Sequence, residues 1–463
     1  MTAEILKRTG LSKLFIVMVL GFIALVILGV VFIMLFQNPV TPPAKQTLTV
    51  WGVWDDTSDL REIIDGYQFL HPYVTVNYVK VRFEEYEDML IKAWAKNTGP
   101  DIYMLPHSWV NKFRSDEFIA PMPVATNVYY YTTKKVLFQE QTEITPATEP
   151  SLTPARIKSD FVDVVYGDVV FNDQIYALPL AMDSLSMYYN RTLLGYARVA
   201  EPPVTWDEFT GVVTRIAVLD AEDNIIRAGA ALGTYDNIPR ASDIVTLLMM
   251  QNGTNMSDGK GVYFNTASGS DGTYFPGQEA LRFYTDFAKN SKSVYTWNST
   301  MPNALDSFAD GRLAFFLGYR YQDEEIRSKA SGIDYAIAPV PQVNAQTPIS
   351  VANYWLYTVA RQSPRSELAW NFVQYAASNQ QVRPYLANTG QVSALRAVIN
   401  EQLQDPELAV FAQQALTARS WYHGRSPEEA DEYFGIMVET VAAGTAGIKD
   451  AIDLAANKIQ QGY

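Results

Sequence analysis

Two short stretches of this chain place aromatic and acidic side chains at the ends of predicted β-strands. The first, Trp51–Asp56 (WGVWDD), closes and follows the apolar run at 48–53, and the second, His107–Trp109 (HSW), follows the run DIYML at 101–105. An indole ring offers a flat face for stacking, and a carboxylate accepts hydrogen bonds in fixed directions. Trp54, Asp55 and Trp109 are therefore candidate contacts for a polar ligand.

The elements that must position these side chains alternate between strand and helix. After the strand at 48–53, Asp59 and Glu62 have the spacing of a helix start, and His71-Pro72 ends that helix. A strand at 74–81, a second helix and a strand at 101–105 follow. This β-α-β-α-β order predicts a parallel sheet with right-handed crossovers, and such sheets bind ligands at the carboxyl ends of their strands.

The sequence has no pattern that is typical of a catalytic, metal or cofactor site. The three histidines, His71, His107 and His423, lie far apart and lack metal-ligand spacing, and the chain has no cysteine. It also lacks the glycine-rich nucleotide motifs and the GxSxG motif of hydrolases. We therefore expect no catalytic residue, no metal and no cofactor.

One uninterrupted apolar run lies near the N-terminus. Leu14–Phe36 carries no charge and exceeds the about 20 residues that a helix needs to cross a bilayer. Lys7, Arg8 and Lys13 precede it, which predicts a cytoplasmic N-terminus over 1–13 and an extracytoplasmic chain after the linker 37–46. A cleaved signal peptide is the alternative, but this run is long for one and Gln37-Asn38-Pro39 is a poor cleavage site. We expect a single-pass anchor in the cell membrane.

Charge, length and local motifs add further limits. Thirty-six basic against 50 acidic residues give a net charge of −14, which argues against a nucleic-acid partner. The chain after the anchor is long enough for two or three domains or lobes. Thr205–Glu208 predicts a helix capping box, and Asn172-Asp173 predicts a hairpin turn. The Thr- and Pro-rich segment 126–159 lacks clear periodicity and predicts an insertion or a long surface loop.

Several segments, in this order and spacing, resemble the extracellular solute-binding proteins of ABC importers, in the sugar-binding branch that includes maltose-binding protein. The resemblance covers about 47–460. The matching segments are LTVW at 48–51, GPDIYML at 99–105, IYALPLAMDSLSMYYNRTLL at 175–194, PPVTWDEF at 202–209, FADGRLAFFLG at 308–318, APVP at 338–341, SELAWNFVQYAAS at 366–378 and NTGQVSALR at 388–396.

The resemblance implies an α/β, two-lobed periplasmic-binding-protein-like fold of type II, preceded here by the N-terminal transmembrane helix. Lobe one would comprise 47–181 and 339–388, and lobe two 182–338 and 389–463. The ligand, a sugar, would lie in the cleft between the lobes and be delivered to ABC permease subunits. APVP at 338–341 would be one of the segments that cross between the lobes.

The resemblance also points to site residues in the later loops. In the family, Asp55 aligns with a polar ligand contact, Asp183 with a sugar-binding carboxylate, and Tyr235 and Asp236 with aromatic or acidic contacts. Arg320 departs from the family pattern and implies either an acidic ligand or a salt bridge with Asp323 or Glu324. The full set of expected ligand contacts is Trp54, Asp55, Trp109, Asp183, Tyr235, Asp236, Arg320 and Trp355, the last being either a stacking platform or part of the core.

Two other functions remain open on the sequence. An anchored sensor or adhesin would use the same lobes without transport. A carbohydrate hydrolase would need two carboxylates roughly 5–10 Å apart, which Asp55, Asp183 and Asp236 could supply. The ligand itself is not predicted beyond a sugar or related polar solute.

Overall fold

The computed structural model of the chain describes residues 15–29, 42–136, 139–269, 272–329 and 332–463. Residues 15–29 form a helix. Within the described residues, no helix combines the length and the apolar character that a membrane crossing needs. The predicted anchor, Leu14–Phe36, is described only over 15–29. The predicted cytoplasmic segment 1–13 and residues 37–41 of the linker lie outside the described residues.

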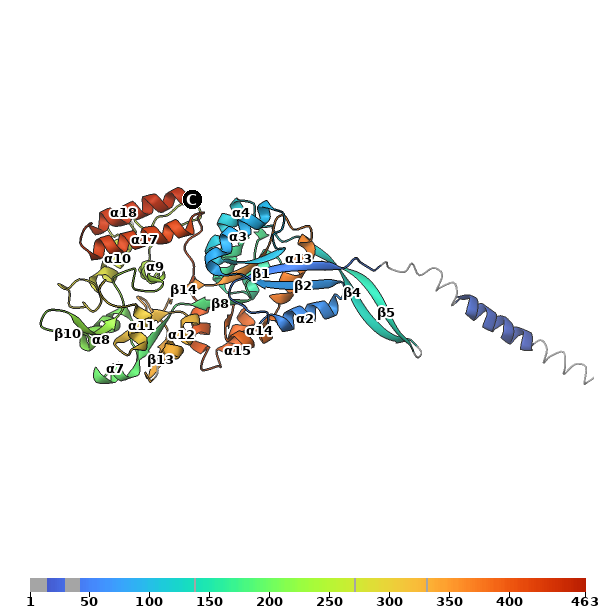
Figure 1. The fold of residues 1–463 in the computed structure, drawn as a ribbon, viewed down its shortest axis with the longest axis horizontal. Helices are drawn as coiled ribbons and strands as arrows, with labels where there is room; N and C mark the ends of the chain where they lie inside the picture. The colour runs from blue at the N-terminus through green and yellow to red at the C-terminus, as the bar shows by residue number, and fades with distance from the viewer. Residues whose placement is uncertain (1–14, 30–41, 137–138, 270–271, 330–331) are drawn as a thin grey trace, which may run out of the picture. The chain divides into compact units, whose positions relative to one another are not determined.

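The chain forms two compact units, and the smaller one takes in Tyr129–Ala147 and the described residues up to Lys45. Strands β4 (Ala125–Val136) and β5 (Gln139–Pro150) pair with each other as a two-stranded sheet (Figure 1). Helix α5 (Pro154–Asp160) begins soon after. Of the two alternatives for 126–159, the long loop is therefore wrong, and the insertion stays a prediction. The many threonine, valine and tyrosine residues favour strand conformation even without an alternating core pattern.

The larger unit, Gln46–Val128 and Thr148–Tyr463, contains a first sheet near its start. Strand β1 pairs in parallel with β2 and β3, whereas β15 joins the far side of β3 in the antiparallel direction. The parallel β-α-β-α-β unit is thus confirmed. The strands, in spatial order, are β15 (Trp355–Val359), β3 (Ile102–Pro106), β1 (Gln46–Gly52) and β2 (Val74–Lys80). The helices of this region are α2 (Arg61–Leu70), α3 (Phe83–Ala95), α4 (Val110–Ser115) and α13 (Ser366–Ala376), with the 3₁₀ turn η1 (His107–Trp109) (Figure 1).

Helix α2 ends at Leu70, before His71-Pro72, as predicted, but its start differs. The side chain of Asp59 does not cap the helix, because its Oδ2 accepts a hydrogen bond from the backbone nitrogen of Asp56 at 2.7 Å. Asp59 thus stabilises the turn after β1, and the helix begins one residue later than the motif indicates, with Leu60 at the N-cap position. This turn carries Trp54 and Asp55.

A second sheet has five strands, with β9 antiparallel to both β12 and β13. Their order is β10 (Val218–Leu219), β11 (Ile225–Ala230), β12 (Leu313–Gly318), β9 (Ser186–Asn190) and β13 (Tyr335–Ala338). The helices of this region are α7 (Arg191–Tyr196), α8 (Trp206–Ile216), α9 (Ala241–Gln251), α10 (Pro276–Asp286), α11 (Ala304–Ala309) and α12 (Tyr321–Lys329). Helices α17 (Pro427–Ala442) and α18 (Ile448–Ile459) pack against α9 and α10, and η2 (Gln460–Gly462) follows them.

Two local predictions in this part of the chain are confirmed. Thr205 and Glu208 form a reciprocal capping box at the start of α8. Strands β6 (Val170–Phe171) and β7 (Gln174–Ile175) form a hairpin, and both turn residues, Asn172 and Asp173, have positive φ angles of 50° and 58°. Asparagine and aspartate tolerate this left-handed conformation better than most residues, which explains the turn.

A third, smaller sheet lies where the chain passes between the first two. Strand β8 leads directly into β9 of the second sheet, and β14 leads directly into β15 of the first. The strand order in this third sheet is β16 (Val392–Ser393), β8 (Ala181–Ser184), β14 (Ser350–Asn353) and β17 (Ala418–Arg419). The helices of this region are α6 (Asp163–Val169), α14 (Val382–Thr389), α15 (Arg396–Gln402) and α16 (Ala409–Ala415). The larger unit is therefore an α/β fold of two sheet-centred lobes joined through this linking sheet, while the residue boundaries of the lobes stay a prediction.

Candidate functional site

A cavity of about 940 Å³ lies at the linking sheet, with walls from both lobes. Its volume falls within the range of about 300–1,000 Å³ that is usual for small-molecule sites. The first lobe contributes the ends of β1 and β3, and the second contributes the segments before α9 and around the start of α12. The predicted contacts that line this cavity are Trp54, Asp55, Trp109, Asp183, Arg320 and Trp355.

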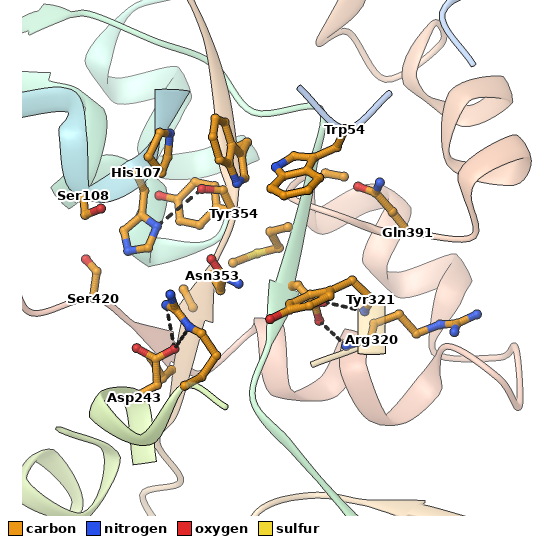
Figure 2. A pocket seen from close by; sticks show the side chains of 18 of the residues that line it. Trp54, His107, Ser108, Asp243, Arg320, Tyr321, Asn353, Tyr354, Gln391 and Ser420 are labelled. Carbon is orange, nitrogen blue, oxygen red and sulfur yellow. Dashed lines mark hydrogen bonds and ion pairs between the residues drawn. The ribbon is translucent and has the colours of Figure 1, made fainter. Parts of the chain in front are cut away.

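Three aromatic rings form a cluster on the first-lobe wall. Trp54 stacks on Phe83 with ring centroids 5.7 Å apart, and it meets the edge of Trp355, also at 5.7 Å. Trp54 remains 52% exposed, and Figure 2 shows its indole in the pocket, above Tyr321. The cluster offers a flat apolar face to a ring-shaped ligand. Phe83 has no motif that marks it as a site residue, and the sequence analysis missed it.

Trp109 and His107 line the cavity but are largely engaged with the protein. Trp109 stacks on Phe113 with centroids 5.5 Å apart and an interplanar angle of 6°. His107 stacks parallel to Tyr354 at 4.9 Å. Figure 2 shows both His107 and Tyr354 on one side of the pocket. These stacked rings are therefore part of the packed wall, in contrast to the more exposed Trp54.

Asp55 is buried, and its carboxylate accepts hydrogen bonds from two other elements of the fold. Its Oδ2 accepts a hydrogen bond from the hydroxyl of Tyr357 at 2.8 Å, and its Oδ1 accepts one from the hydroxyl of Tyr385 at 2.9 Å. Burial raises the pKa of this carboxyl against the effect of these two bonds. Asp55 thus ties the end of β1 to β15 and α14 at the cavity wall.

Asp183 points its carboxylate at the start of helix α12. Its Oδ1 accepts from the backbone nitrogens of Ser184 and Arg320 at 2.8 and 3.0 Å, and its Oδ2 accepts from that of Tyr321 at 3.2 Å. Burial outweighs these bonds and raises the pKa of Asp183 to about 6. The side chain therefore stabilises the junction between β8 and α12 as well as lining the cavity.

Arg320 makes the salt bridge that the sequence left as one of two alternatives. Its Nη1 lies 3.0 Å from Oδ2 of Asp323, whose side chain is only 1% exposed. Asp323 also binds Nε of Arg327 at 2.8 Å and the hydroxyl of Tyr335 at 2.7 Å. Three donors thus converge on the buried carboxylate of Asp323, whereas Arg320 itself is 21% exposed and lines the cavity.

Tyr235 and Asp236 are not brought into the cavity. Their backbone nitrogens both donate to Oε1 of Glu439 in α17, at 2.6 and 3.3 Å. The hydroxyl of Tyr235 donates to the carbonyl oxygen of Asp431 at 2.9 Å. These bonds fix the segment against α17, outside the lining of the cavity.

A second cluster closes the far side of the cavity around Asp168. This buried carboxylate accepts from the hydroxyl of Tyr354 at 2.6 Å, from Nε2 of His423 at 3.0 Å and from the hydroxyl of Ser420. Burial opposes its ionisation, but the hydrogen bonds of His423 and Ser420 and the charges of His423 and His107 together outweigh burial and hold the pKa of Asp168 below its usual value. Asp168 in turn raises the pKa of His423 against the effect of burial. The cluster joins β14–β15 to the chain after β17.

The cavity also contains polar side chains that the sequence analysis did not select. Ser108, Tyr321, Asn353 and Gln391 line it and are labelled in Figure 2. Arg240 lines it as well, paired with Asp243. Gln391 lies within the segment NTGQVSALR at 388–396 that carries the family resemblance, which was the available signal. Arg240 lies in a loop with no recognisable pattern.

Residues 52–383 match the family described as bacterial extracellular solute-binding protein, and the chain belongs to this family. The sequence-based resemblance is thus confirmed. The chain is 22% identical over 345 residues to a maltotriose-binding protein of Pyrococcus abyssi, a match that covers 72% of this chain and 64% of that relative, less than two thirds of its length. It is 21% identical to a galactooligosaccharide-binding protein of Bacillus subtilis, with 88% and 87% of the two chains covered.

Solved structures show the same two-lobed fold. A cyclic alpha-maltosyl-1,6-maltose binding protein from Arthrobacter globiformis superposes with a TM-score of 0.71 at 18% identity, over 90% of this chain and 99% of that chain. The expected α/β periplasmic-binding-protein-like architecture is therefore confirmed for the part of the chain after the N-terminal run. The named relatives are binding proteins, not enzymes.

Proposed function

We propose that this protein captures a carbohydrate in the cavity between its two lobes and delivers it to an ABC permease. The observation that carries the proposal is the exposed aromatic cluster of Trp54, Phe83 and Trp355 in a cavity of about 940 Å³. Sugar rings combine apolar C–H faces with outward hydroxyl groups, and aromatic faces beside polar groups suit both.

Polar groups in the same cavity as the aromatic cluster support a ligand rich in hydroxyl groups. Among the described residues, the side chains of Ser108, Tyr321, Asn353 and Gln391 have no hydrogen-bond partner in the protein. Each carries a donor, an acceptor or both. A ligand with several hydroxyl groups would supply the missing partners. The relatives named for maltotriose and galactooligosaccharides favour a neutral oligosaccharide as the ligand class.

The state of the carboxylates supports binding without catalysis. Asp55 and Asp183 each hold both oxygens in hydrogen bonds to the protein, and Asp236 lies outside the cavity lining. A glycosidase needs one carboxylate as acid and another as base or nucleophile, both directed at the substrate. The predicted pair is not available in that arrangement.

The apolar run Leu14–Phe36 is proposed to anchor the chain in the cell membrane with its binding lobes on the extracytoplasmic side. The family is described as extracellular, which supports this orientation. An anchored protein stays near permease subunits in the same membrane, and this raises its effective concentration there. A protein recovered from the medium and beginning after residue 36 would contradict the anchor.

The function is tested by a thermal-shift screen of the full chain in a detergent without a sugar headgroup. The panel contains maltotriose, galactotriose, monosaccharides, sugar acids and polyols. A ligand at about 100 times its dissociation constant adds roughly 2.7 kcal/mol to the free energy of unfolding, which raises the melting temperature visibly. We expect a shift with a neutral oligosaccharide that is recovered unchanged after incubation.

The matched control compares two exposed aromatic residues. Trp54→Ala should abolish the shift, because it removes the stacking face. Phe69→Ala should keep it, because Phe69 is 82% exposed and does not line the cavity. A wild-type chain that responds to no carbohydrate, or that cleaves one, would overturn the proposal.

A further inference from the structure

Arg240 differs from the other arginines of the cavity wall in how its guanidinium is held. Arg320 and Arg327 both pair with the buried carboxylate of Asp323, and Nη1 of Arg320 takes part in that pair. Arg240 pairs with Asp243 through Nε and Nη2, each 2.7 Å from Oδ2. Among the described residues, its Nη1 has no acceptor. The edge of the guanidinium formed by Nε and Nη2 is therefore held by Asp243, while the end that carries Nη1 is unpaired within the described part of the chain. We call this end the open edge.

The anchoring fixes the direction of the open edge. Oδ2 of Asp243 also accepts the hydroxyl of Tyr319 at 2.7 Å, so the carboxylate cannot turn freely. The guanidinium of Arg240 lies over the ring of Tyr319, 5.9 Å from its centroid. Tyr319 is itself stacked on Tyr321, a cavity residue, with an interplanar angle of 11°. A side chain held in this way loses little conformational freedom when it binds a ligand.

The backbone at Arg240 is in an unusual conformation. Its φ of 59° and ψ of 35° are left-handed, and it stands directly before helix α9. Arginine rarely adopts this conformation, which glycine adopts without strain. Strained backbone positions cluster at ligand-binding sites, where they direct a side chain. The side chain of Arg240 is 40% exposed, so it is accessible at the cavity surface.

The charges around Arg240 indicate which ligand group it suits. Asp243 neutralises the charge of the Arg240 guanidinium, and Asp323 forms ion pairs with the other two arginines of the wall, Arg320 and Arg327. The wall also carries Asp183, Glu324 and Asp431. The open edge is thus a pair of N–H donors without an excess of positive charge. Such a donor pair fits two adjacent hydroxyl oxygens better than a carboxylate or a phosphate, which need net positive charge.

We propose that Arg240 is a specificity-determining residue that donates from the open end of its guanidinium to two adjacent hydroxyl groups of a neutral sugar. The inference rests on the proposed function and adds to it the second-lobe residue that selects the ligand through hydrogen bonds. The sequence analysis left Arg320 as either a contact for an acidic ligand or a salt-bridge partner, and the inference instead makes Arg240 the arginine that contacts the ligand, which it takes to be neutral.

The test measures the affinity of the full chain for maltotriose and galactotriose by calorimetry, in a detergent without a sugar headgroup. Arg240→Gln removes the guanidinium, and Arg240→Lys keeps the charge but replaces the rigid planar guanidinium by one ammonium group on a flexible stem, which cannot present the same pair of N–H donors while it holds Asp243. Each should weaken binding of the better trisaccharide by about tenfold or more. The matched control is Arg365→Gln. Arg365 is 36% exposed and pairs with the buried Asp101 away from the cavity, so affinity should remain within about threefold of the wild type.

Monodeoxy analogues of the same trisaccharide separate ligand contact from a structural effect. The wild type should discriminate against removal of either of two adjacent hydroxyl groups, and Arg240→Lys should lose that discrimination. If Arg240→Gln fails to fold, as its melting curve would show, Arg240→Lys decides the matter. Unchanged affinity or unchanged discrimination in Arg240→Lys would overturn the inference and leave the proposed function intact. A wild type that binds neither the trisaccharides nor any other sugar overturns both.

Discussion

Asp55 and Asp183 both reach the cavity wall, and their hydrogen bonds decide what each carboxylate does. Asp55 receives two tyrosine hydroxyls, and Asp183 receives three backbone N–H groups. Hydrogen bonds to a carboxylate stabilise its charged form, whereas burial destabilises it. In both residues burial is the larger effect, so both pKa values are raised. At the scale of single residues, these carboxylates organise the wall, while Trp54 and Arg240 line the cavity with exposed side chains.

Asp183 is expected to make stability depend on pH. With a pKa raised to about 6, the folded protein keeps a proton that the unfolded chain has lost above about pH 4. This carboxyl therefore lowers the free energy of unfolding as the pH rises through that window, by up to about 3 kcal/mol, and has no further effect at higher pH.

Urea unfolding of the wild type and Asp183→Asn between about pH 4 and 7 checks this. Asparagine does not titrate, so Asp183→Asn should gain stability relative to the wild type as the pH rises to about 6. Above that pH the two profiles should run parallel. Parallel profiles over the whole range would show that Asp183 does not titrate with a raised pKa.

At the scale of elements, short junctions position the wall. The turn after β1 is held by Asp59, the start of α12 by Asp183 and the start of α9 by the pairing of Arg240 with Asp243. Each junction lies at the end of a strand or the start of a helix, where backbone groups are unpaired within the element. The ends of elements, more than their middles, carry the side chains that line the cavity.

The capping box of α8 gives a prediction at this scale. Oγ1 of Thr205 accepts from the backbone nitrogen of Glu208 at 3.3 Å, and Oε2 of Glu208 accepts from the backbone nitrogen of Thr205, also at 3.3 Å. Thr205→Ala should lower the free energy of unfolding by about 1 kcal/mol, and Thr205→Ser should restore most of the loss. Urea unfolding measures both, and ligand affinity should stay unchanged because α8 lies outside the cavity lining. A Thr205→Ala chain as stable as the wild type would mean that the box contributes little.

At the scale of the whole molecule, the cavity wall is built from residues that lie far apart in the chain. The first lobe supplies Trp54 and Trp355, and the second supplies Arg240 and Tyr321, with the linking sheet between them. A ligand that contacts both walls stabilises the arrangement in which the lobes lie close together. The same contacts would present a loaded form to a permease.

Hydrogen exchange should show this two-sided contact. Maltotriose, or the trisaccharide that binds better, should slow amide exchange after β1 and also at 319–322 before and in α12. Exchange in α8 should not change, since that helix does not line the cavity. Protection of one wall alone would mean that the ligand binds a single lobe without bridging the cleft.

The sequence by itself determined the features that depend on neighbours a few residues away. The alternation of strands and helices over 48–105, the capping box at Thr205 and the turn at Asn172-Asp173 are all present as expected. Each rests on local hydrogen bonds or on the intrinsic preference of a residue for its backbone conformation. The family segments extended this local information to the two-lobed fold, which is why most expected contacts lie on the cavity wall.

Only the tertiary structure decided how the polar groups of the wall are engaged. Asp55 meets tyrosines that follow it by 302 and 330 residues, and Asp183 meets the backbone of Arg320 across 137 residues. Tyr235 lies against α17 instead of the cavity through Glu439 and Asp431. Arg240 becomes a candidate because Asp243 and Tyr319 orient it. Hydrogen bonds between residues so far apart in the chain depend on the packing of whole elements, and no short pattern of residues encodes them.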